Sequence, residues 1–295
     1  MNENIRKFIR DDVDVNSITD PIEDTRSESD KMDDLLQKSF ISLSDNYPKP
    51  PSYLSIRDEF AGDIIPIFTP GNISAITGKA KAKKSFVQTM FTAATSMNGA
   101  LNSRIIADLP EGKEMVILFD TEQSKYAVYR VTNRVKKLTN GNDENFVAFS
   151  LRGMDTDEII ALMNHVVDKF QNIGVIYIDQ IADLTRSIND EKEAVKIVKW
   201  LEKMSNDYDL HICCVIHQNK GDGYATGWLG SQIMKKAETI ISVEKEEQNK
   251  DISHVRPERS RGREFEPFSI IIDNEGMPKM IGTQETAQYN TELSI

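Results

Sequence analysis

Two hydrophobic patterns alternate along the chain from about residue 60 onward. Unbroken apolar runs, typical of strands that are buried on both faces, occur at 115–119, 173–178 and 211–216. Stretches with apolar residues at helical spacing lie between and around them, at 84–97, 123–137, 155–170 and 189–206. The alternation predicts a three-layer α/β sandwich, in which helices cover both faces of a mostly parallel sheet.

Shorter segments add detail to this predicted sheet. Further strands are expected at 72–76 and 146–151. Helices are scarce in the last third of the chain, where short strands are expected to extend the sheet as antiparallel hairpins at one edge, at 239–243, 252–255 and 268–272. In the helix at 123–137, four positions are expected to face the core: Tyr126, Tyr129, Val131 and Val135.

Acidic residues are concentrated near the N-terminus. The 295 residues carry a net charge of −11, and the first 45 contain 12 acidic and 6 basic side chains. A chain this acidic is not expected to coat duplex DNA or an anionic membrane with its whole surface. Residues 1–50 are polar, so we expect a largely disordered acidic tail. Within it, 32–42 forms either a short segment that docks on a protein partner or a solvated leader.

The rest of the chain is expected to form one folded domain over 51–285, followed by a flexible tail over 286–295. No apolar run is long enough to cross a membrane, and no apolar segment near the N-terminus suggests a signal peptide. Cys213 and Cys214 are adjacent in one apolar run, so they point to opposite faces of a strand. These features are typical of a cytoplasmic protein without disulfides.

The first strand of this domain runs into a loop that matches most of a phosphate-binding motif. The pattern G-x-x-x-x-G-K-[ST] places its first glycine at Gly78, its lysine at Lys84 and its hydroxyl at Ser85. In such loops backbone N–H groups surround the phosphates of ATP, the lysine contacts the outer phosphates, and the hydroxyl binds Mg²⁺. The predicted nucleotide-binding residues are Gly78, Lys79, Ala80, Lys81, Ala82, Lys83, Lys84, Ser85 and Phe86.

One position departs from the motif, because Lys83 replaces the second glycine. A side chain there stands where glycine normally allows the backbone to approach the phosphates closely. The small residues Ala80 and Ala82 could keep the loop compact. The alternative interpretation is a lysine-rich surface turn before a helix, which the preceding strand and following helix disfavour.

Two strands end in carboxylates that suit phosphoryl chemistry. Asp179 follows the apolar run 175–178, and ligands of parallel sheets bind at the carboxyl ends of the strands, so Asp179 is predicted to bind Mg²⁺ together with Ser85. Glu122 follows the strand at 115–119 and is predicted to orient or deprotonate the attacking water. The alternatives are an ordinary turn aspartate and a glutamate that favours a helix N-terminus.

The order of these motifs resembles that of the RecA-like ATPases. The loop at 78–85, Asp120-Thr121-Glu122, Asp179 and His217-Gln218 follow one another at successive strand ends. Within that family the chain is most similar to compact hexameric helicases of the plasmid RepA type, with DnaB-type replicative helicases as larger relatives. The likeness covers about residues 60–281. It implies a RecA-like fold, catalytic roles for Glu122 and Lys84, and a γ-phosphate sensor at Gln218, with His217 beside it.

The resemblance also implies a contact with single-stranded DNA. In RecA-like rings the loop after the sensor strand faces the central channel, and here residues 219–231 are rich in glycine. Lys220 would contact phosphates, and Tyr224 or Trp228 would stack on a base. The alternative is a flexible surface loop with Trp228 packed inward.

A basic cluster between the late strands resembles the residues with which RecA-like subunits reach a neighbour's nucleotide. Arg261 would be the catalytic finger in trans, and Arg259 or Arg263 its companion. The alternative is an exposed hairpin with solvated arginines.

The leading hypothesis is an ATP-hydrolysing motor that acts on single-stranded DNA, uses ATP and Mg²⁺, and assembles as a homo-oligomer, specifically a hexameric ring. A second hypothesis, motivated by Lys83, is a nucleotide-gated DNA-binding or partner-recruiting module of a mobile element, without unwinding activity. A filament-forming recombinase is less favoured, because the acidic tail does not look like an N-terminal polymerisation element.

Overall fold

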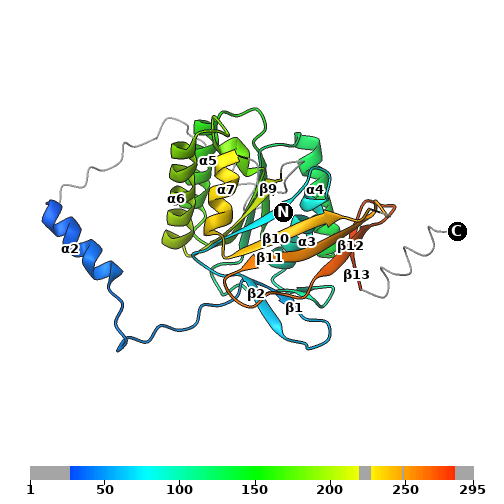
Figure 1. The fold of residues 1–295 in the computed structure, drawn as a ribbon, viewed down its shortest axis with the longest axis horizontal. Coiled ribbons are helices and arrows are strands. Elements are labelled where there is room, and N and C mark those ends of the chain that lie inside the picture. Colours follow the sequence, from blue (N-terminus) through cyan, green and yellow to red (C-terminus); the bar gives the residue numbers. More distant parts are fainter. Residues whose placement is uncertain (1–26, 219–226, 248, 283–295) are drawn as a thin grey trace. The chain divides into compact units, whose positions relative to one another are not determined.

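The computed structural model describes residues 27–218, 227–247 and 249–282 (Figure 1). They divide into two compact units, one that ends at Pro50 and one that begins at Pro51. In the first unit, helix α2 (Glu28–Ser39) begins at a capping box, in which the side chains of Ser27 and Asp30 each accept a hydrogen bond from the other's backbone N–H. The helix starts four residues before the segment expected at 32–42, and it buries none of its side chains.

The main sheet of the second unit is mostly parallel, as the alternating pattern predicts. Within the described residues its strand order is β13-β12-β11-β10-β3-β9-β8-β6-β7. The parallel strands are β10 (Thr239–Lys245), β3 (Ile73–Gly78), β9 (His211–His217), β8 (Ile173–Asp179), β6 (Met115–Asp120) and β7 (Phe146–Ser150). The antiparallel edge is formed by β11 (Ile252–Ser260), β12 (Phe268–Ile272) and β13 (Pro278–Ile281).

Helices cover both faces of this sheet (Figure 1). One face carries α3 (Lys84–Ser96) and α4 (Lys125–Leu138). The other carries α5 (Thr156–Lys169), the short 3₁₀ helix η1 (Ile181–Leu184), α6 (Glu191–Asp207) and α7 (Gly227–Lys236). The predicted three-layer α/β sandwich with antiparallel edge strands is therefore confirmed. None of the helices in the described part of the chain is long and apolar enough to cross a membrane.

A second, smaller sheet packs beside α3 and was not expected from the sequence. Its order is β2-β1-β5-β4, formed by β2 (Ile64–Phe68), β1 (Leu54–Arg57), β5 (Ile105–Ala107) and β4 (Ala100–Leu101). These strands have two to five residues, too few for an alternating pattern to stand out from the surrounding sequence.

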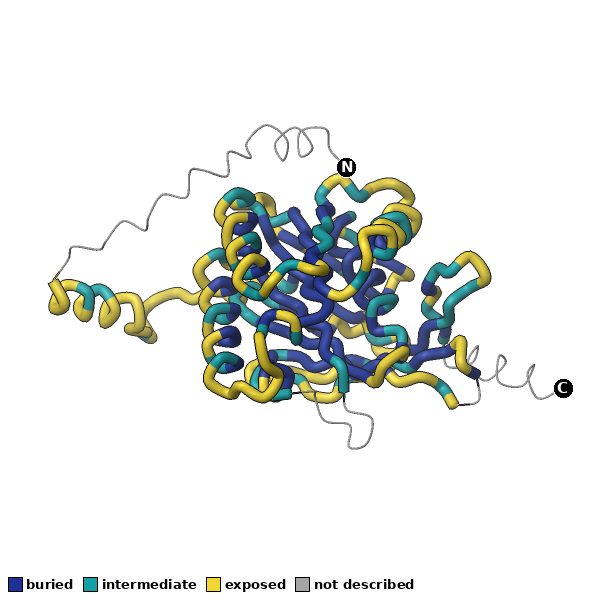
Figure 2. The backbone as a smooth tube through the Cα atoms, turned by 90° about the horizontal axis from the view of Figure 1, so that it is seen from above, coloured by how far each residue is buried: buried dark blue, intermediate teal, exposed yellow. Residues whose placement is uncertain are grey.

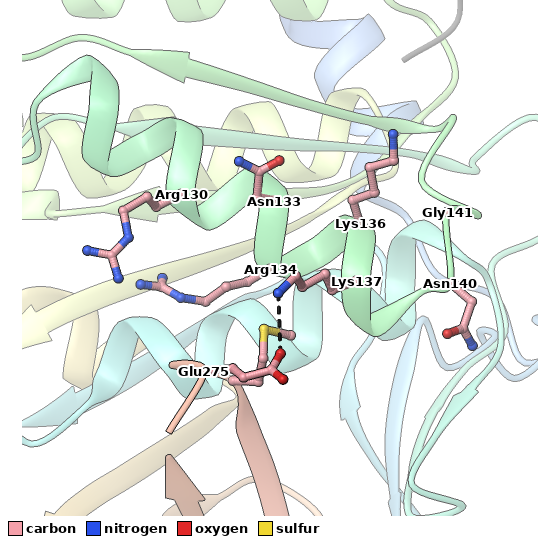
Figure 3. A pocket seen from close by; sticks show the side chains of 9 residues that line it. Arg130, Asn133, Arg134, Lys136, Lys137, Asn140, Gly141 and Glu275 are labelled. Carbon is pink, nitrogen blue, oxygen red and sulfur yellow. Dashed lines mark hydrogen bonds and ion pairs between the residues drawn. The ribbon is translucent and has the colours of Figure 1, made fainter. Parts of the chain in front are cut away.

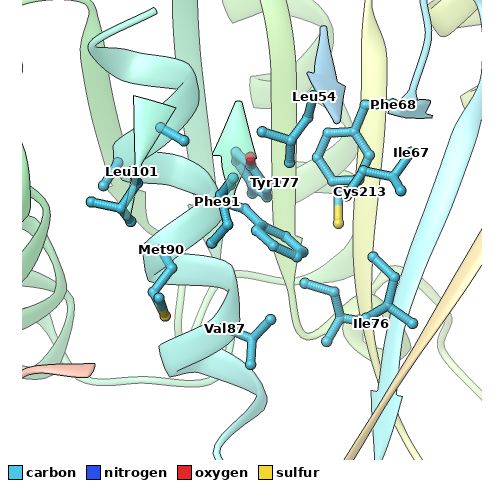
Figure 4. Close-up of a cluster of buried hydrophobic side chains, with 14 of the residues drawn as sticks. Leu54, Ile67, Phe68, Ile76, Val87, Met90, Phe91, Leu101, Tyr177 and Cys213 are labelled. Carbon is cyan, nitrogen blue, oxygen red and sulfur yellow. The ribbon is translucent and has the colours of Figure 1, made fainter. Parts of the chain in front are cut away.

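The main core fills the space between this small sheet, α3 and the main sheet (Figure 4). Phe68 of β2 packs edge-on against Phe91 of α3, with ring centroids 5.9 Å apart, and tilts against Tyr177 of β8 at 6.1 Å. Figure 2 shows the same arrangement as a buried sheet between more exposed helices. The burial of both faces explains why the central strands read as unbroken apolar runs.

One expectation about the core was wrong. Tyr126 and Tyr129 are 71% and 58% exposed, whereas Val128, Val131 and Val135 are buried. The three valines are spaced at i, i+3 and i+7, so they form one face of α4, and both tyrosines lie outside that face.

Candidate functional site

The loop between β3 and α3 approaches a neighbouring strand too closely for a side chain at its first residue. A Cβ atom on Gly78 would lie 2.3 Å from the backbone carbonyl oxygen of Val243 in β10, and Gly78 has φ +157°. Gly78 pairs with His217 of β9 and Val243 pairs with Val255 of β11, so the backbone on both sides of this contact is held by sheet pairing. Gly78 is therefore required by the packing of the loop as well as by its shape.

Lys83 adopts the conformation that the glycine of the motif would supply. Its φ of 73° and ψ of 28° are left-handed, and it forms the N-cap of α3, where its carbonyl oxygen accepts hydrogen bonds from Phe86 and Val87. Lys81 also has a positive φ of 65°. The loop geometry is thus kept without the second glycine, at a conformational cost of about 1–2 kcal/mol for each such residue.

The ammonium of Lys84 is buried and has three partners. It donates to the carbonyl oxygens of Gly78 at 2.8 Å and Lys79 at 3.2 Å, and it lies 2.8 Å from His217 Nδ1 at the end of β9. Burial lowers the pKa of Lys84 to about 8, although the charges of Asp179 and Glu122 oppose this shift. Lys84 is therefore held inside the loop, within reach of any phosphate that the loop surrounds.

Ser85 and Asp179 form the pair that the sequence predicts for Mg²⁺. Ser85 Oγ donates to Asp179 Oδ2 at 2.8 Å, and Asp120 lies opposite Asp179 in the register of β6 and β8. Burial raises the pKa of Asp179 to about 7 and also raises that of Asp120. The hydroxyl of Ser85 and the two neighbouring buried carboxyls are oxygen ligands of the kind that fit Mg²⁺.

Asp120 positions Glu122. One carboxylate oxygen of Asp120 accepts hydrogen bonds from the backbone N–H groups of Glu122 and Gln123, at 3.2 and 2.7 Å, and the other accepts from the Gln123 side chain. The Glu122 side chain stays 56% exposed, with Oε2 3.5 Å from His217 Nε2. The backbone of Glu122 is thus held by Asp120 while its carboxylate remains accessible to solvent, which suits a residue that orients a water molecule.

His217 links Lys84 to Glu122. Because the Lys84 ammonium can only donate, His217 Nδ1 must accept, and the ring proton then resides on Nε2, facing Glu122. Burial, assisted by the charge of Lys84, lowers the pKa of His217. A neutral imidazole thus joins two of the predicted catalytic side chains.

Gln218, the predicted γ-phosphate sensor, occupies a different place from His217. Its backbone N–H donates to the Gly78 carbonyl at 3.1 Å, and it lines a cavity of about 370 Å³ beside Lys79, Ala80 and Ala82. It is therefore next to the loop, but His217 is the residue that contacts Lys84 and Glu122.

A larger cavity opens next to Phe86, the residue that follows Ser85. The Arg134 guanidinium of α4 lies over the Phe86 ring, 4.6 Å from its centroid. Arg134 also lines a cavity of about 650 Å³ between α4 and the turn before β13, with Arg130, Asn133, Lys136, Lys137, Asn140, Gly141, Glu275 and Met277. Figure 3 shows Arg130, Arg134 and Lys137 projecting from α4, with Lys137 paired to Glu275 of the turn before β13.

This cavity is strongly basic. Helix α4 carries five basic side chains and no acidic one, in a protein whose net charge is negative. Burial and the nearby Arg130 lower the pKa of Arg134, and among the described residues no carboxylate pairs with it. The cavity therefore suits an anionic or electron-rich aromatic ligand.

The predicted DNA-binding residues fall only in part within the described chain. Lys220 and Tyr224 lie outside the described residues. Trp228 begins α7 with 40% of its surface exposed, and its backbone N–H donates to the carbonyl of Ile188, which is itself 49% exposed. Trp228 is thus not packed into the core, and it adjoins a second exposed apolar residue.

The three arginines of the late cluster lie at the opposite edge of the sheet from the phosphate loop. Ser260 pairs with Thr239, and Thr239 pairs with Ser74, near the start of β3, whereas the loop follows the other end of that strand. Arg259 is exposed, Arg261 donates to the Lys236 carbonyl at 2.7 Å, and Arg263 pairs with Asp63. These arginines therefore lie away from the loop between β3 and α3 of their own chain.

Asp120 and His217 were named from the sequence without a prediction of their contacts, and Arg134 was not named. Asp120 was visible as a strand-end carboxylate, but its role depends on hydrogen bonds to the following turn. The contact of His217 with Lys84 depends on β9 lying beside β3. Arg134 carries no local signal at all, because it approaches Phe86 only through the packing of α4 against α3.

The comparisons with known proteins place the fold. No protein-family model matches the sequence, and no curated protein matches it either. Among solved structures, the chain is similar to the RadB recombinase, with a TM-score of 0.52 and 14% identity over 73% of this chain and 93% of that one. At that identity the likeness concerns the fold, which is RecA-like.

Proposed function

We propose that the protein binds and hydrolyses ATP at the loop between β3 and α3 and uses the energy to act on single-stranded DNA. The observation that carries the proposal is the convergence of Lys84, Ser85, Asp179 and Glu122 at one edge of a parallel sheet. Each side chain has the chemistry that phosphoryl transfer from a nucleoside triphosphate needs. The RecA-like fold supports the same assignment.

In this proposal the residues divide the work between binding and chemistry. Lys84 moves from the loop carbonyls to the outer phosphates, and Ser85 and Asp179 hold Mg²⁺, which neutralises charge on the phosphates. Glu122 orients the attacking water and accepts its proton. His217, which contacts both Lys84 and Glu122, is better placed than Gln218 to respond when a γ-phosphate displaces Lys84.

The basic cavity beside Phe86 would receive the base and sugar of the nucleotide. Arg134, which lines this cavity, lies over the ring of Phe86 in the first turn of α3, so a nucleotide whose phosphates occupy the loop would enter the cavity past Arg134. Arg134 offers a planar cation for stacking on the base. Asn133 and Asn140 offer amide groups that can hydrogen-bond its edge.

The DNA and neighbour contacts remain parts of the proposal. Trp228 and Ile188 form an exposed apolar pair next to the predicted channel loop, where a base could stack. The arginines at the opposite edge of the sheet would serve the nucleotide of an adjacent copy, which requires a head-to-tail assembly such as a hexameric ring. The acidic tail and α2 remain candidates for binding a protein partner.

ATP hydrolysis, titrated with single-stranded DNA, tests the proposal. The parent should hydrolyse ATP faster as DNA is added, and Lys84→Ala should no longer bind ATP. Glu122→Gln should bind ATP but turn over on the order of 10²-fold more slowly. The exposed Glu144→Gln is the matched control and should keep the parental rate. Parental turnover in Glu122→Gln would contradict the assigned chemistry. The mass of the assembly, measured in the presence of an ATP analogue, tests whether the protein forms a hexameric ring.

The second candidate is a nucleotide-gated DNA-binding module without unwinding activity. Lys83 motivates it, because a loop that lacks the second glycine could bind ATP and turn it over slowly. Because the left-handed conformation of Lys83 preserves the loop geometry, we favour the first proposal, in which the protein hydrolyses ATP. Tight ATP binding without turnover in the parent protein would instead favour the module.

A further inference from the structure

The side chain of Lys83 leaves the phosphate loop and crosses to a neighbouring turn. Its ammonium lies 3.8 Å from Asp251 Oδ1, in the turn that leads into β11. The Lys83 side chain is only 13% exposed, whereas that of Asp251 is 76% exposed. The ammonium itself is buried and has no hydrogen-bond partner among the described residues. Its one charged neighbour of opposite sign in that region is therefore Asp251.

We infer that Lys83 is a positioning residue, which holds the phosphate loop against the turn before β11 through Asp251. The inference rests on the proposed nucleotide site. It explains why a lysine can stand in the place of a glycine: the conformational cost of the left-handed backbone is offset by an anchor that a glycine could not provide. The loop is then held ready for phosphates before any nucleotide binds.

The turn that receives Lys83 is itself held in place. The Asp251 backbone N–H donates to Asn249 Oδ1 at 3.0 Å, and its carbonyl accepts from Ile272 at the end of β12. The backbone that carries the Asp251 carboxylate is therefore held by hydrogen bonds on both sides. Burial lowers the pKa of the Lys83 ammonium, the charge of Asp251 opposes this shift, and the charge of Lys245 at the end of β10 adds to it.

A direct contact between Lys83 and the nucleotide is the competing arrangement. The left-handed backbone directs its side chain toward β10 and β11, whereas the three partners of Lys84 lie inside the loop and at β9. Lys83 thus acts through Asp251, and the two arrangements differ in whether the loss of Asp251 matters.

A double-mutant cycle at Lys83 and Asp251 distinguishes the anchor from a direct contact with the nucleotide. Lys83→Met keeps the length of the side chain but removes its charge, and Asp251→Asn removes the partner. Each single variant of the full chain should bind a fluorescent ATP analogue with Mg²⁺ about three- to tenfold more weakly. The double variant should be no weaker than the weaker single variant. Lys83→Arg should restore binding to within about twofold.

A further variant at Lys83 tests whether weaker binding results only from a less stable fold. Lys83→Gly relieves the left-handed backbone but also removes the anchor, so its thermal midpoint should stay within about 2 °C of the parental value while its nucleotide affinity falls. A merely structural lysine would move both quantities in the same direction.

Three outcomes would overturn the inference: additive effects in the double variant, unchanged affinity in Lys83→Met, or an effect of Lys83→Met that Asp251→Asn does not share. The proposed function fails separately, if the parent does not bind the analogue or if Lys84→Ala binds it as well as the parent.

Discussion

Lys84 Nζ lies 2.8 Å from His217 Nδ1, so the lysine of the phosphate loop and the last residue of β9 share a hydrogen bond across the sheet. The other ring nitrogen of His217 faces Glu122 at 3.5 Å. His217 thus lies between a lysine proposed to bind phosphate and a glutamate proposed to orient water, so a change at one of these side chains can affect the other.

This arrangement predicts that two substitutions at His217 separate binding from turnover. Asparagine can place an amide oxygen near the position of Nδ1, but it is too short to reach Glu122. His217→Asn should therefore bind ATP with nearly parental affinity and hydrolyse it at least about tenfold more slowly. His217→Ala should lose turnover to a similar extent and also change affinity. Steady-state and equilibrium titrations check both, and parental turnover in His217→Asn would show that the contact with Glu122 has no role.

The cavity beside Phe86 predicts a base-dependent effect of Arg134. If Arg134 contacts the base, Arg134→Ala should weaken ATP binding about five- to tenfold, which corresponds to about 1–1.4 kcal/mol. Binding of inorganic triphosphate, which has no base, should be unchanged. Calorimetric titration with the two ligands makes this comparison. Lys196→Ala, at an exposed position of α6 outside the cavity, is the matched control, and equal weakening of both ligands would place Arg134 on the phosphates instead.

Gly78 predicts a contrast between two glycines with positive φ. An alanine at Gly78 would place Cβ 2.3 Å from the Val243 carbonyl oxygen, so Gly78→Ala should destabilise the fold by about 3 kcal/mol or more. Gly112 also has a positive φ of 81°, but nothing lies within 4 Å of its Cβ position, so Gly112→Ala should cost only about 1 kcal/mol. Denaturant unfolding measures both. Equal losses would mean that the contact with β10 is relaxed without cost.

A buried histidine predicts how stability depends on pH. His211 is fully buried, stacks on Phe68 at 4.2 Å, and its Nδ1 lies 2.8 Å from the Thr69 carbonyl oxygen. Burial lowers the pKa of His211 to about 3, so the folded protein keeps it neutral. The 3.5 Å separation from Glu238 is therefore not an ion pair at neutral pH.

Between about pH 6.5 and 3, the unfolded chain binds a proton at His211 that the folded chain does not. This contribution to the free energy of unfolding is fully present above pH 6.5 and falls by about 1.4 kcal/mol per pH unit below it. His211→Gln should lower stability at pH 7, because the ring stack is lost, yet decline less between pH 7 and 5. The exposed His165→Gln should keep the parental slope, and an unchanged slope in His211→Gln would contradict the assignment.

Much of the candidate site could be predicted from the sequence because its polar side chains directly follow predicted strands. Lys84 and Ser85 follow the first core strand, and Asp179 ends another, so a local pattern places them at the same sheet edge. The tyrosines of α4 were misplaced, because helical spacing alone does not decide between overlapping faces of similar hydrophobicity. The small sheet was missed because its strands are short and pair over distances of up to about 50 residues in sequence.

The sequence by itself determined the alternation of strands and helices and the residue types at the carboxyl ends of the strands, since these follow from local periodicity. The tertiary structure alone decided which strands are neighbours. The position of β9 beside β3 brings His217 to Lys84, and the antiparallel course of β11 brings its first residues to the phosphate loop and its arginines to the far edge. The left-handed backbone of Lys83, with its side chain directed at Asp251, likewise depends on the hairpin packed against it. Strand pairing joins residues far apart in sequence, and no local pattern contains that information.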